Sequence, residues 1–164
     1  MGVFKPRRLL KPGDAAPQFQ LRTLTGETFD LAEALPRGPV LLGFFKVDCP
    51  VCQFTFPFLE RLHRSGNGSI QFYGVSQDGV RETQSFNREQ EITFPALLDE
   101  ARLGYPVSNA FGISIVPTLF LIESDGRVSW ASESFSRKDL EALGARVGAA
   151  PFLPGERVPD YRPG

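Results

Sequence analysis

Two cysteines, the only ones in the chain, stand three positions apart in the segment Cys49-Pro50-Val51-Cys52. Such a pair can ligate zinc, carry an iron–sulfur cluster or haem, form a structural disulfide, or act as a redox-active dithiol. Structural zinc needs four ligands, and the single histidine, His63, brings the soft ligands only to three. A four-cysteine cluster fails on the same count within one chain, and c-type haem attachment needs a histidine where Gln53 stands. A disulfide that closes so short a loop constrains the unfolded chain little, so the pair predicts a redox-active dithiol.

The dithiol is expected at the start of a helix, which makes its two sulfurs chemically unequal. Cysteines three positions apart lie on one helix face, close enough to form a disulfide. Unpaired N–H groups and the helix dipole favour a thiolate at Cys49, and Pro50 suits the first helical position. We therefore predict that Cys49 is the nucleophile and that Cys52, one turn further and more buried, is the resolving thiol. This chemistry requires no metal and no cofactor.

A buried strand and an amphipathic helix are predicted on either side of the dithiol. Residues 39–45 form a continuous apolar run that begins with Pro39, a pattern typical of a strand buried on both faces. After the dithiol, apolar residues from Phe54 to Leu62 recur at helical spacing, and the turn residues 65–68 end the helix. His63, near this helix end, is expected to be a solvated surface residue.

The rest of the chain alternates strands and helices, which indicates an α/β fold with a central sheet and helices on both faces. We expect three parts: a basic N-terminal tail over 1–11, one domain over 12–147, and an irregular Pro/Gly-rich tail over 148–164. Asp30 is expected to cap the first helix, and Ser136 the last. The pattern predicts an N-terminal hairpin over 18–29, further strands at 70–75, 94–98, 118–122 and 127–131, helices at 31–35, 80–90 and 136–147, and short helical turns near 101 and 107–111.

Charge and hydropathy exclude several classes of partner. The 164 residues carry 18 Lys and Arg against 19 Asp and Glu, a net charge of −1 that does not attract nucleic acid. The basic cluster Lys5, Arg7, Arg8 and Lys11 is interpreted as a solvated tail, with a membrane-surface or partner contact as the alternative. No run approaches the roughly 18 apolar residues of a spanning helix, so stable membrane insertion is not expected. The chain as given is expected to be cytoplasmic, or extracytoplasmic if a targeting segment has been removed.

Three motifs stand in order along the chain: residues 12–21, residues 44–52 followed by Pro57, and residues 112–121. Together they resemble the thioredoxin fold, specifically the redoxin branch that holds cytochrome-maturation-type thioredoxins and peroxiredoxins. Residues 12–21 resemble the opening Gly-Asp and Pro-x-Phe-x-Leu pattern of that branch, and residues 44–52 its strand and active-site turn. Pro57 stands where the family kinks its first long helix, and residues 112–121 resemble the segment that holds the family's cis-proline, here Pro117. The long interval between Cys52 and Pro117 fits the strand–helix insertion of the redoxin branch, which we place within residues 79–110.

The resemblance implies a thiol-disulfide oxidoreductase that reduces or exchanges disulfides through a mixed disulfide. Pro117 in cis would lie against the disulfide, and the Val116 backbone would pair with an extended substrate. The implied partners are a disulfide-containing protein or small thiol and an upstream dithiol reductant, and the chain is expected to be a monomer or weak dimer. The acids that some relatives use to accept the Cys52 proton are absent, because Gly43 and Thr55 occupy their positions.

Lys46 and Asp48 are the nearest titratable candidates for a proton relay to the dithiol. Asp48 would oppose formation of the Cys49 thiolate, whereas Lys46 would favour it. The Pro-Val pair between the cysteines predicts a reduction potential between those of reductive thioredoxins and strong oxidases.

The main alternative function is a peroxiredoxin-like, thiol-dependent peroxidase, with Cys52 peroxidatic and Cys49 resolving. Peroxiredoxins polarise the peroxide bond with a Pro-x-x-x-Thr-x-x-Cys motif and an Arg. In this chain Phe45 stands at the Pro position, Cys49 at the Thr position and Pro117 at the Arg position. A binding or scaffold role is a third possibility, and the presence of both cysteines argues against it.

Overall fold

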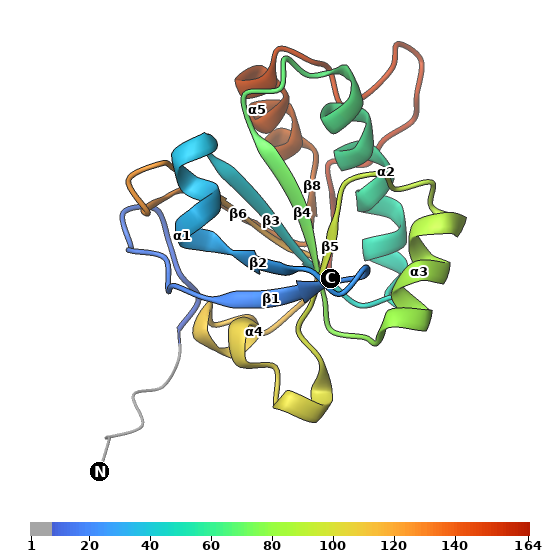
Figure 1. Cartoon of the computed structure of the whole chain (residues 1–164). Helices are drawn as coiled ribbons and strands as arrows, with labels where there is room; N and C mark the ends of the chain where they lie inside the picture. Colours follow the sequence, from blue (N-terminus) through green and yellow to red (C-terminus); the bar gives the residue numbers. More distant parts are fainter. Residues whose placement is uncertain (1–7) are drawn as a thin grey trace.

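The computed structural model describes residues 8–164, which form a seven-stranded mixed sheet with helices on both faces (Figure 1). The strand order is β2 (Thr28–Asp30), β1 (Gln20–Thr23), β5 (Ala96–Leu98), β4 (Gln71–Ser76), β3 (Val40–Phe45), β6 (Thr118–Ile122) and β7 (Val128–Glu133). Strands β3, β4 and β5 are mutually parallel, and the other pairings are antiparallel. This arrangement confirms the predicted α/β class and the N-terminal hairpin, β1 with β2. Lys5 and Arg7 of the basic cluster lie outside the described residues, and Arg8 forms an ion pair of 3.3 Å with Asp14.

The observed helices and strands follow the predicted order, with small shifts at their ends. The strands are β1 Gln20–Thr23, β2 Thr28–Asp30, β3 Val40–Phe45, β4 Gln71–Ser76, β5 Ala96–Leu98, β6 Thr118–Ile122, β7 Val128–Glu133, β8 Phe135–Ser136 and β9 Tyr161–Arg162. The α-helices are α1 Leu31–Ala34, α2 Pro50–Ser65, α3 Val80–Glu89, α4 Pro106–Ala110 and α5 Arg137–Val147, with 3-10 turns η1 Leu35–Arg37 and η2 Ala101–Leu103. Helix α3 and strand β5 lie within residues 79–110, where the insertion was predicted.

Strand β3 lies inside the sheet, and every one of its six residues is buried. It pairs in parallel with β4 and antiparallel with β6, so both edges and both faces are covered by protein. Gly43 lets helix α2 approach the strand closely, since a Cβ there would meet the rings and methyls of Phe56 and Leu119 at 3.3 Å. The strand therefore ends at a fixed point and delivers the next residues to the carboxyl edge of the sheet.

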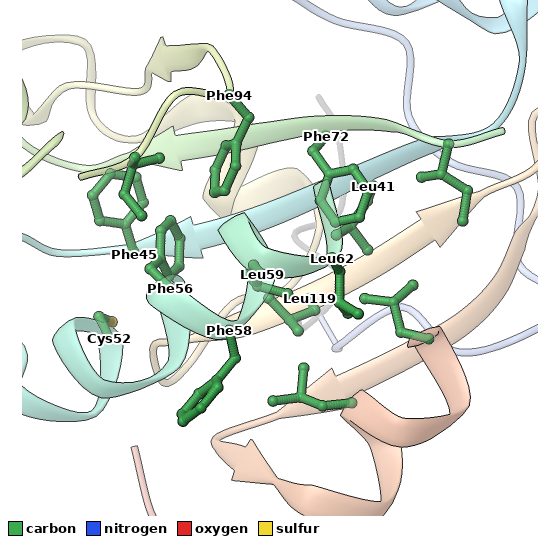
Figure 2. Packing of buried hydrophobic residues seen from close by; sticks show 14 of the residues in the cluster. Leu41, Phe45, Cys52, Phe56, Phe58, Leu59, Leu62, Phe72, Phe94 and Leu119 are labelled. Atoms are coloured by element: carbon green, nitrogen blue, oxygen red, sulfur yellow. The ribbon is translucent and has the colours of Figure 1, made fainter. Parts of the chain in front are cut away.

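Two apolar layers hold the helices against the sheet. One layer packs α2, α3 and α5 on one face, and Figure 2 shows Phe56, Leu59 and Leu62 of α2 directed at the strands. The other layer packs α1 and α4 on the opposite face. Full burial of side chains of this size contributes about 1.5–3 kcal/mol each. His63 lies at the margin of the first layer, half-buried beside the rings of Phe72 and Phe94, so it is less solvated than the sequence predicts.

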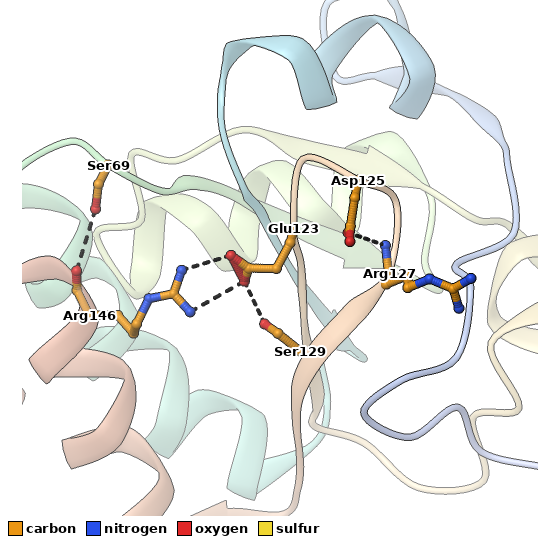
Figure 3. Close-up of polar contacts among 6 residues, drawn as sticks. All are labelled: Ser69, Glu123, Asp125, Arg127, Ser129 and Arg146. Atoms are coloured by element: carbon orange, nitrogen blue, oxygen red, sulfur yellow. Dashed lines mark hydrogen bonds and ion pairs between the residues drawn. The ribbon is translucent and has the colours of Figure 1, made fainter.

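An ion pair ties the β6–β7 hairpin to α5 at the end of β6 that lies away from Pro117 (Figure 3). The Arg146 guanidinium donates to both carboxylate oxygens of Glu123, at 2.8 and 3.3 Å, and Ser129 donates to the same carboxylate. Hydrogen bonding to Arg146 lowers the pKa of Glu123. This contact fixes the last helix relative to β6, the strand that begins directly after the cis-proline.

The C-terminal segment is ordered against the domain, although the sequence predicts an irregular tail. Strand β9 pairs with β8, with Arg162 opposite Phe135. Phe152 packs against the rings of Phe58 and Phe135, which explains how a Pro-rich segment is held without a long strand or helix of its own. Within residues 8–164 no helix is long and apolar enough to cross a membrane.

Candidate functional site

Cys49 caps the N-terminus of α2, as the sequence predicted. Its backbone is extended, with φ −84° and ψ 114°, and Pro50 occupies the first turn. The Cys52 N–H donates to the Cys49 sulfur over 3.2 Å. A backbone N–H aimed at this sulfur stabilises a thiolate there, in the same way that helix N-termini bind anions.

The loop before β6 brings Val116 and Pro117 to the same sulfur. The Val116–Pro117 peptide bond is cis, as the resemblance implied. Thr118 pairs with Phe44 of β3, which places the cis-proline beside the turn that carries Cys49. The Cys49 thiol donates to the Val116 carbonyl oxygen at 3.6 Å. Two segments that are 67 positions apart in the sequence therefore meet at one reactive atom.

Cys52 lies beneath Cys49 and has no exposed surface. Burial is the main cause that raises the pKa of the Cys52 thiol well above the ordinary value of a cysteine. A hydrogen bond with Cys49 and the negative charges of Cys49 and Asp48 raise the Cys52 pKa further, and a backbone hydrogen bond with Lys46 opposes them. Both cysteines are free thiols in this structure. The dithiol thus pairs a half-buried sulfur that faces a helix N-terminus with a sulfur kept protonated by its surroundings.

Within residues 8–164, no carboxylate hydrogen-bonds either cysteine in place of the acids missing from positions 43 and 55. The space at Gly43 is closed by Phe56 and Leu119, and the Thr55 hydroxyl donates to the Val51 carbonyl at 2.7 Å. Lys46 and Asp48 are both exposed on the turn before Cys49. The negative charge of Asp48 raises the Cys52 pKa and so disfavours the Cys52 thiolate.

Two residues that the sequence reasoning missed hold the turn before Cys49 in place. The Asp78 carboxylate accepts from the Val47 N–H at 2.8 Å, and the Gln53 side-chain amide donates to the Val47 carbonyl at 2.9 Å. Asp78 follows β4, the strand beside β3, so its place at the carboxyl edge of a parallel pair was the available signal. Both bonds position the turn and do not reach the sulfurs.

The end of the C-terminal segment lies against the cis-proline. The Gly164 N–H donates to the Ser134 hydroxyl at 2.9 Å, and the Ser134 N–H donates to the Pro117 carbonyl at 2.8 Å. A side chain at Gly164 would collide with the carbonyl oxygen of Val116. Arg162 stacks over the Phe54 ring of α2, with 4.7 Å from its guanidinium carbon to the ring centroid. No sequence pattern predicts this contact, because it depends on how the tail returns to the sheet.

A model of the AhpC/TSA family matches residues 12–131. The chain belongs to the AhpC/TSA family. It is 31% identical over 127 residues to the thiol-disulfide oxidoreductase ResA of Halalkalibacterium halodurans, covering 76% of this chain and 70% of that protein. The matched segment contains both cysteines and Pro117, so the whole site lies within the family's domain.

Both a disulfide oxidoreductase and a peroxidoxin are among the solved structures that share the fold of this AhpC/TSA protein. A secreted disulfide oxidoreductase of Mycobacterium tuberculosis superposes with a TM-score of 0.64 at 25% identity, covering 80% of this chain and 95% of the other. The peroxidoxin BcpB of the same organism superposes with a TM-score of 0.69 at 25% identity, covering 84% and 96%. Because proteins of both kinds share this fold, the fold alone does not distinguish the two activities, and the distinction rests on the residues of the site.

Proposed function

We propose that this AhpC/TSA protein is a thiol-disulfide oxidoreductase in which Cys49 attacks and Cys52 resolves. The observation that carries the assignment is the asymmetry of the pair. The Cys49 sulfur accepts a backbone N–H at the start of α2, whereas Cys52 is fully buried with a raised pKa. An attacking thiol needs access and thiolate character, and a resolving thiol needs only to reach its neighbour.

The reaction proceeds by two thiol-disulfide exchanges. The Cys49 thiolate attacks one sulfur of a substrate disulfide, forming a mixed disulfide and expelling the other sulfur as a thiolate that takes up a proton. Cys52 then loses its proton and attacks the Cys49 sulfur. The Cys49–Cys52 disulfide forms, the second substrate thiol leaves, and two electrons have passed from the protein to the substrate. A dithiol reductant restores the pair, and the same steps in reverse oxidise a dithiol.

Val116 and Pro117 are proposed to receive the substrate backbone, and the contact of the Cys49 thiol with the Val116 carbonyl supports this role. A substrate that approaches from the Gly164 side must share this carbonyl with the C-terminal segment or displace it. Lys46 and Asp48 remain proposed proton-relay residues. Of the two, Lys46 is favoured, because the charge of Asp48 opposes ionisation of Cys52.

A peroxidase is less well supported, because Cys52 would have to be the attacking thiolate. Its sulfur is fully buried, and the surroundings keep it protonated. The positions that polarise peroxide in peroxiredoxins hold Phe45, Cys49 and Pro117, and neither Phe nor Pro can donate a side-chain hydrogen bond.

The partners are a disulfide substrate and a dithiol reductant. We further propose that the chain is a monomer or weak dimer, which sedimentation at two protein concentrations would test. The cytoplasmic location likewise remains a prediction, and the secreted relative in Mycobacterium tuberculosis makes an extracytoplasmic location the alternative. The labelling of Cys49 by an impermeant thiol reagent in intact cells would separate the two.

The function is tested by supplying the same dithiol reductant with either a protein disulfide or hydrogen peroxide as the acceptor. We expect disulfide reduction to be accelerated and to be lost in Cys49→Ser. Faster consumption of peroxide than of disulfide, retained in Cys49→Ser and lost in Cys52→Ser, would instead establish the peroxidase.

A further inference from the structure

A cavity of about 300 Å³ opens next to Lys46 and Val116, two residues that hydrogen-bond to Cys49, although Cys49 itself does not line it. It is lined by the loop that ends in Val116, by Lys46 of the active-site turn, and by Gln77, Tyr105, Ser108 and Asn109 from the far side. Cys49 is hydrogen-bonded to two of the lining residues. Its thiol donates to the Val116 carbonyl at 3.6 Å, and its N–H donates to the Lys46 carbonyl at 3.3 Å. We therefore expect a group next to a sulfur attached to Cys49 to reach the cavity.

The far wall is held by a chain of hydrogen bonds that ends on a buried carboxylate. The Gln77 amide donates to the Ser108 hydroxyl at 3.0 Å, and that hydroxyl donates to Asp99 at 2.6 Å. Asp99 has no exposed surface and also accepts the backbone N–H groups of Val107 and Ser108, at 3.1 and 2.6 Å. Such a saturated network fixes the wall before any ligand arrives.

Two side-chain donors that line the cavity, Lys46 and Tyr105, have no partner among residues 8–164. Lys46 carries the only full charge among the lining side chains, and within residues 8–164 no carboxylate lies within 4.0 Å of its ammonium group. Tyr105 has a left-handed backbone, with φ 51°, and across the described part of the chain its hydroxyl makes no hydrogen bond. Backbone strain at a non-glycine residue is concentrated at ligand sites, and here it sets the ring on the rim of the cavity.

We propose that this cavity is a specificity pocket for a carboxylate next to the substrate disulfide, with Lys46 as its counter-ion. The proposal rests on the disulfide reduction inferred above. The volume is at the lower limit of ligand pockets, so it suits one side chain or a fragment rather than a whole cofactor. The C-terminal segment leaves it open, because no residue of 148–164 lines it. An acidic residue beside a protein cysteine and a small organic disulfide with a carboxylate offer the same chemistry.

The test compares peptides whose single cysteine is disulfide-bonded to uncharged 2-thiopyridine and preceded by either Asp or Asn. The measured quantity is the Asp-to-Asn ratio of kcat/KM, divided by the same ratio for reduction by dithiothreitol, which removes the intrinsic reactivity of each peptide. We expect a ratio of about two to five at low salt, the size of one partly solvated ion pair, and a smaller ratio at high salt. Lys46→Gln should bring the ratio to one, and Lys46→Glu should invert it. Lys138→Gln changes the net charge equally on exposed α5 and should leave the ratio unchanged.

If Lys46 acts only as a proton relay, Lys46→Gln would slow the reduction of both peptides equally and leave the ratio unchanged. That result would overturn the proposal. A ratio of one in the native chain, with both peptides reduced, would also overturn it while leaving the proposed function in place. If neither peptide is reduced, the pocket proposal and the proposed function both fail. A small dicarboxylate disulfide and its diamide form a second pair. A preference confined to the peptides would assign the pocket to protein substrates, and one confined to the small pair would assign it to small disulfides.

Discussion

Resolution of the mixed disulfide is the step most sensitive to the burial of Cys52. Cys52 must be ionised to attack, and burial raises its pKa well above the ordinary range. In the mixed disulfide the Cys49 charge is gone, but burial, the largest cause, and the Asp48 charge remain. Below the Cys52 pKa, each pH unit changes the thiolate fraction about tenfold. The resolution rate should therefore rise about tenfold per unit from about pH 6 to about pH 9, with no plateau.

Stopped-flow mixing of the reduced protein with an aromatic disulfide that releases thionitrobenzoate measures this rate directly. The first release reports the attack of Cys49, and the second reports resolution by Cys52. Asp48→Asn removes one exposed negative charge and should speed the second phase at a given pH by no more than about fivefold. A plateau of the second phase below about pH 8 would refute the reasoning, because Cys52 would then ionise far below the raised pKa that its burial causes.

Three further predictions concern the parts of the fold that support the site. Phe56→Ala should lower the free energy of unfolding by about 3–5 kcal/mol in urea titrations, whereas the exposed Leu153→Ala should leave it nearly unchanged. The lowered pKa of Glu123 means that its pair with Arg146 adds stability above the unfolded pKa of Glu and loses it as pH falls through the folded value. Arg146→Met should thus lower the free energy of unfolding by up to about 1 kcal/mol at neutral pH and by a smaller amount at acid pH. An equal loss at both pH values would contradict the assignment. Arg162→Ala should speed amide exchange over residues 159–164, and unchanged exchange would show that Phe54 does not anchor the tail.

The sequence was sufficient for the elements that follow local rules. The buried run 40–45, the Asp30 and Ser136 caps and the Pro at the start of α2 each have a short-range physical cause, and each forms as predicted. The juxtaposition of Cys49 with Val116 could be inferred only from the family resemblance, since 67 positions separate them.

The contacts that escaped prediction depend on long-range geometry rather than on residue type. His63 has a polar side chain at a helix end, yet β4 and the loop before β5 bring Phe72 and Phe94 against it. The tail has a composition typical of irregular segments, yet Phe152 and Arg162 find aromatic partners on α2 and β8. The cavity beside Cys49 forms only where the active-site turn, the residues after β4 and α4 converge.

The most direct test of the central claim is to trap the mixed disulfide. Each single-cysteine variant, Cys52→Ser and Cys49→Ser, is mixed with a disulfide-bonded peptide, and the intact mass is measured after alkylation. Cys52→Ser should accumulate one peptide joined to Cys49, because no thiol remains to release it. Cys49→Ser should accumulate almost none, because the remaining sulfur is buried and protonated. Rapid formation of the adduct on Cys52 and none on Cys49 would contradict the account.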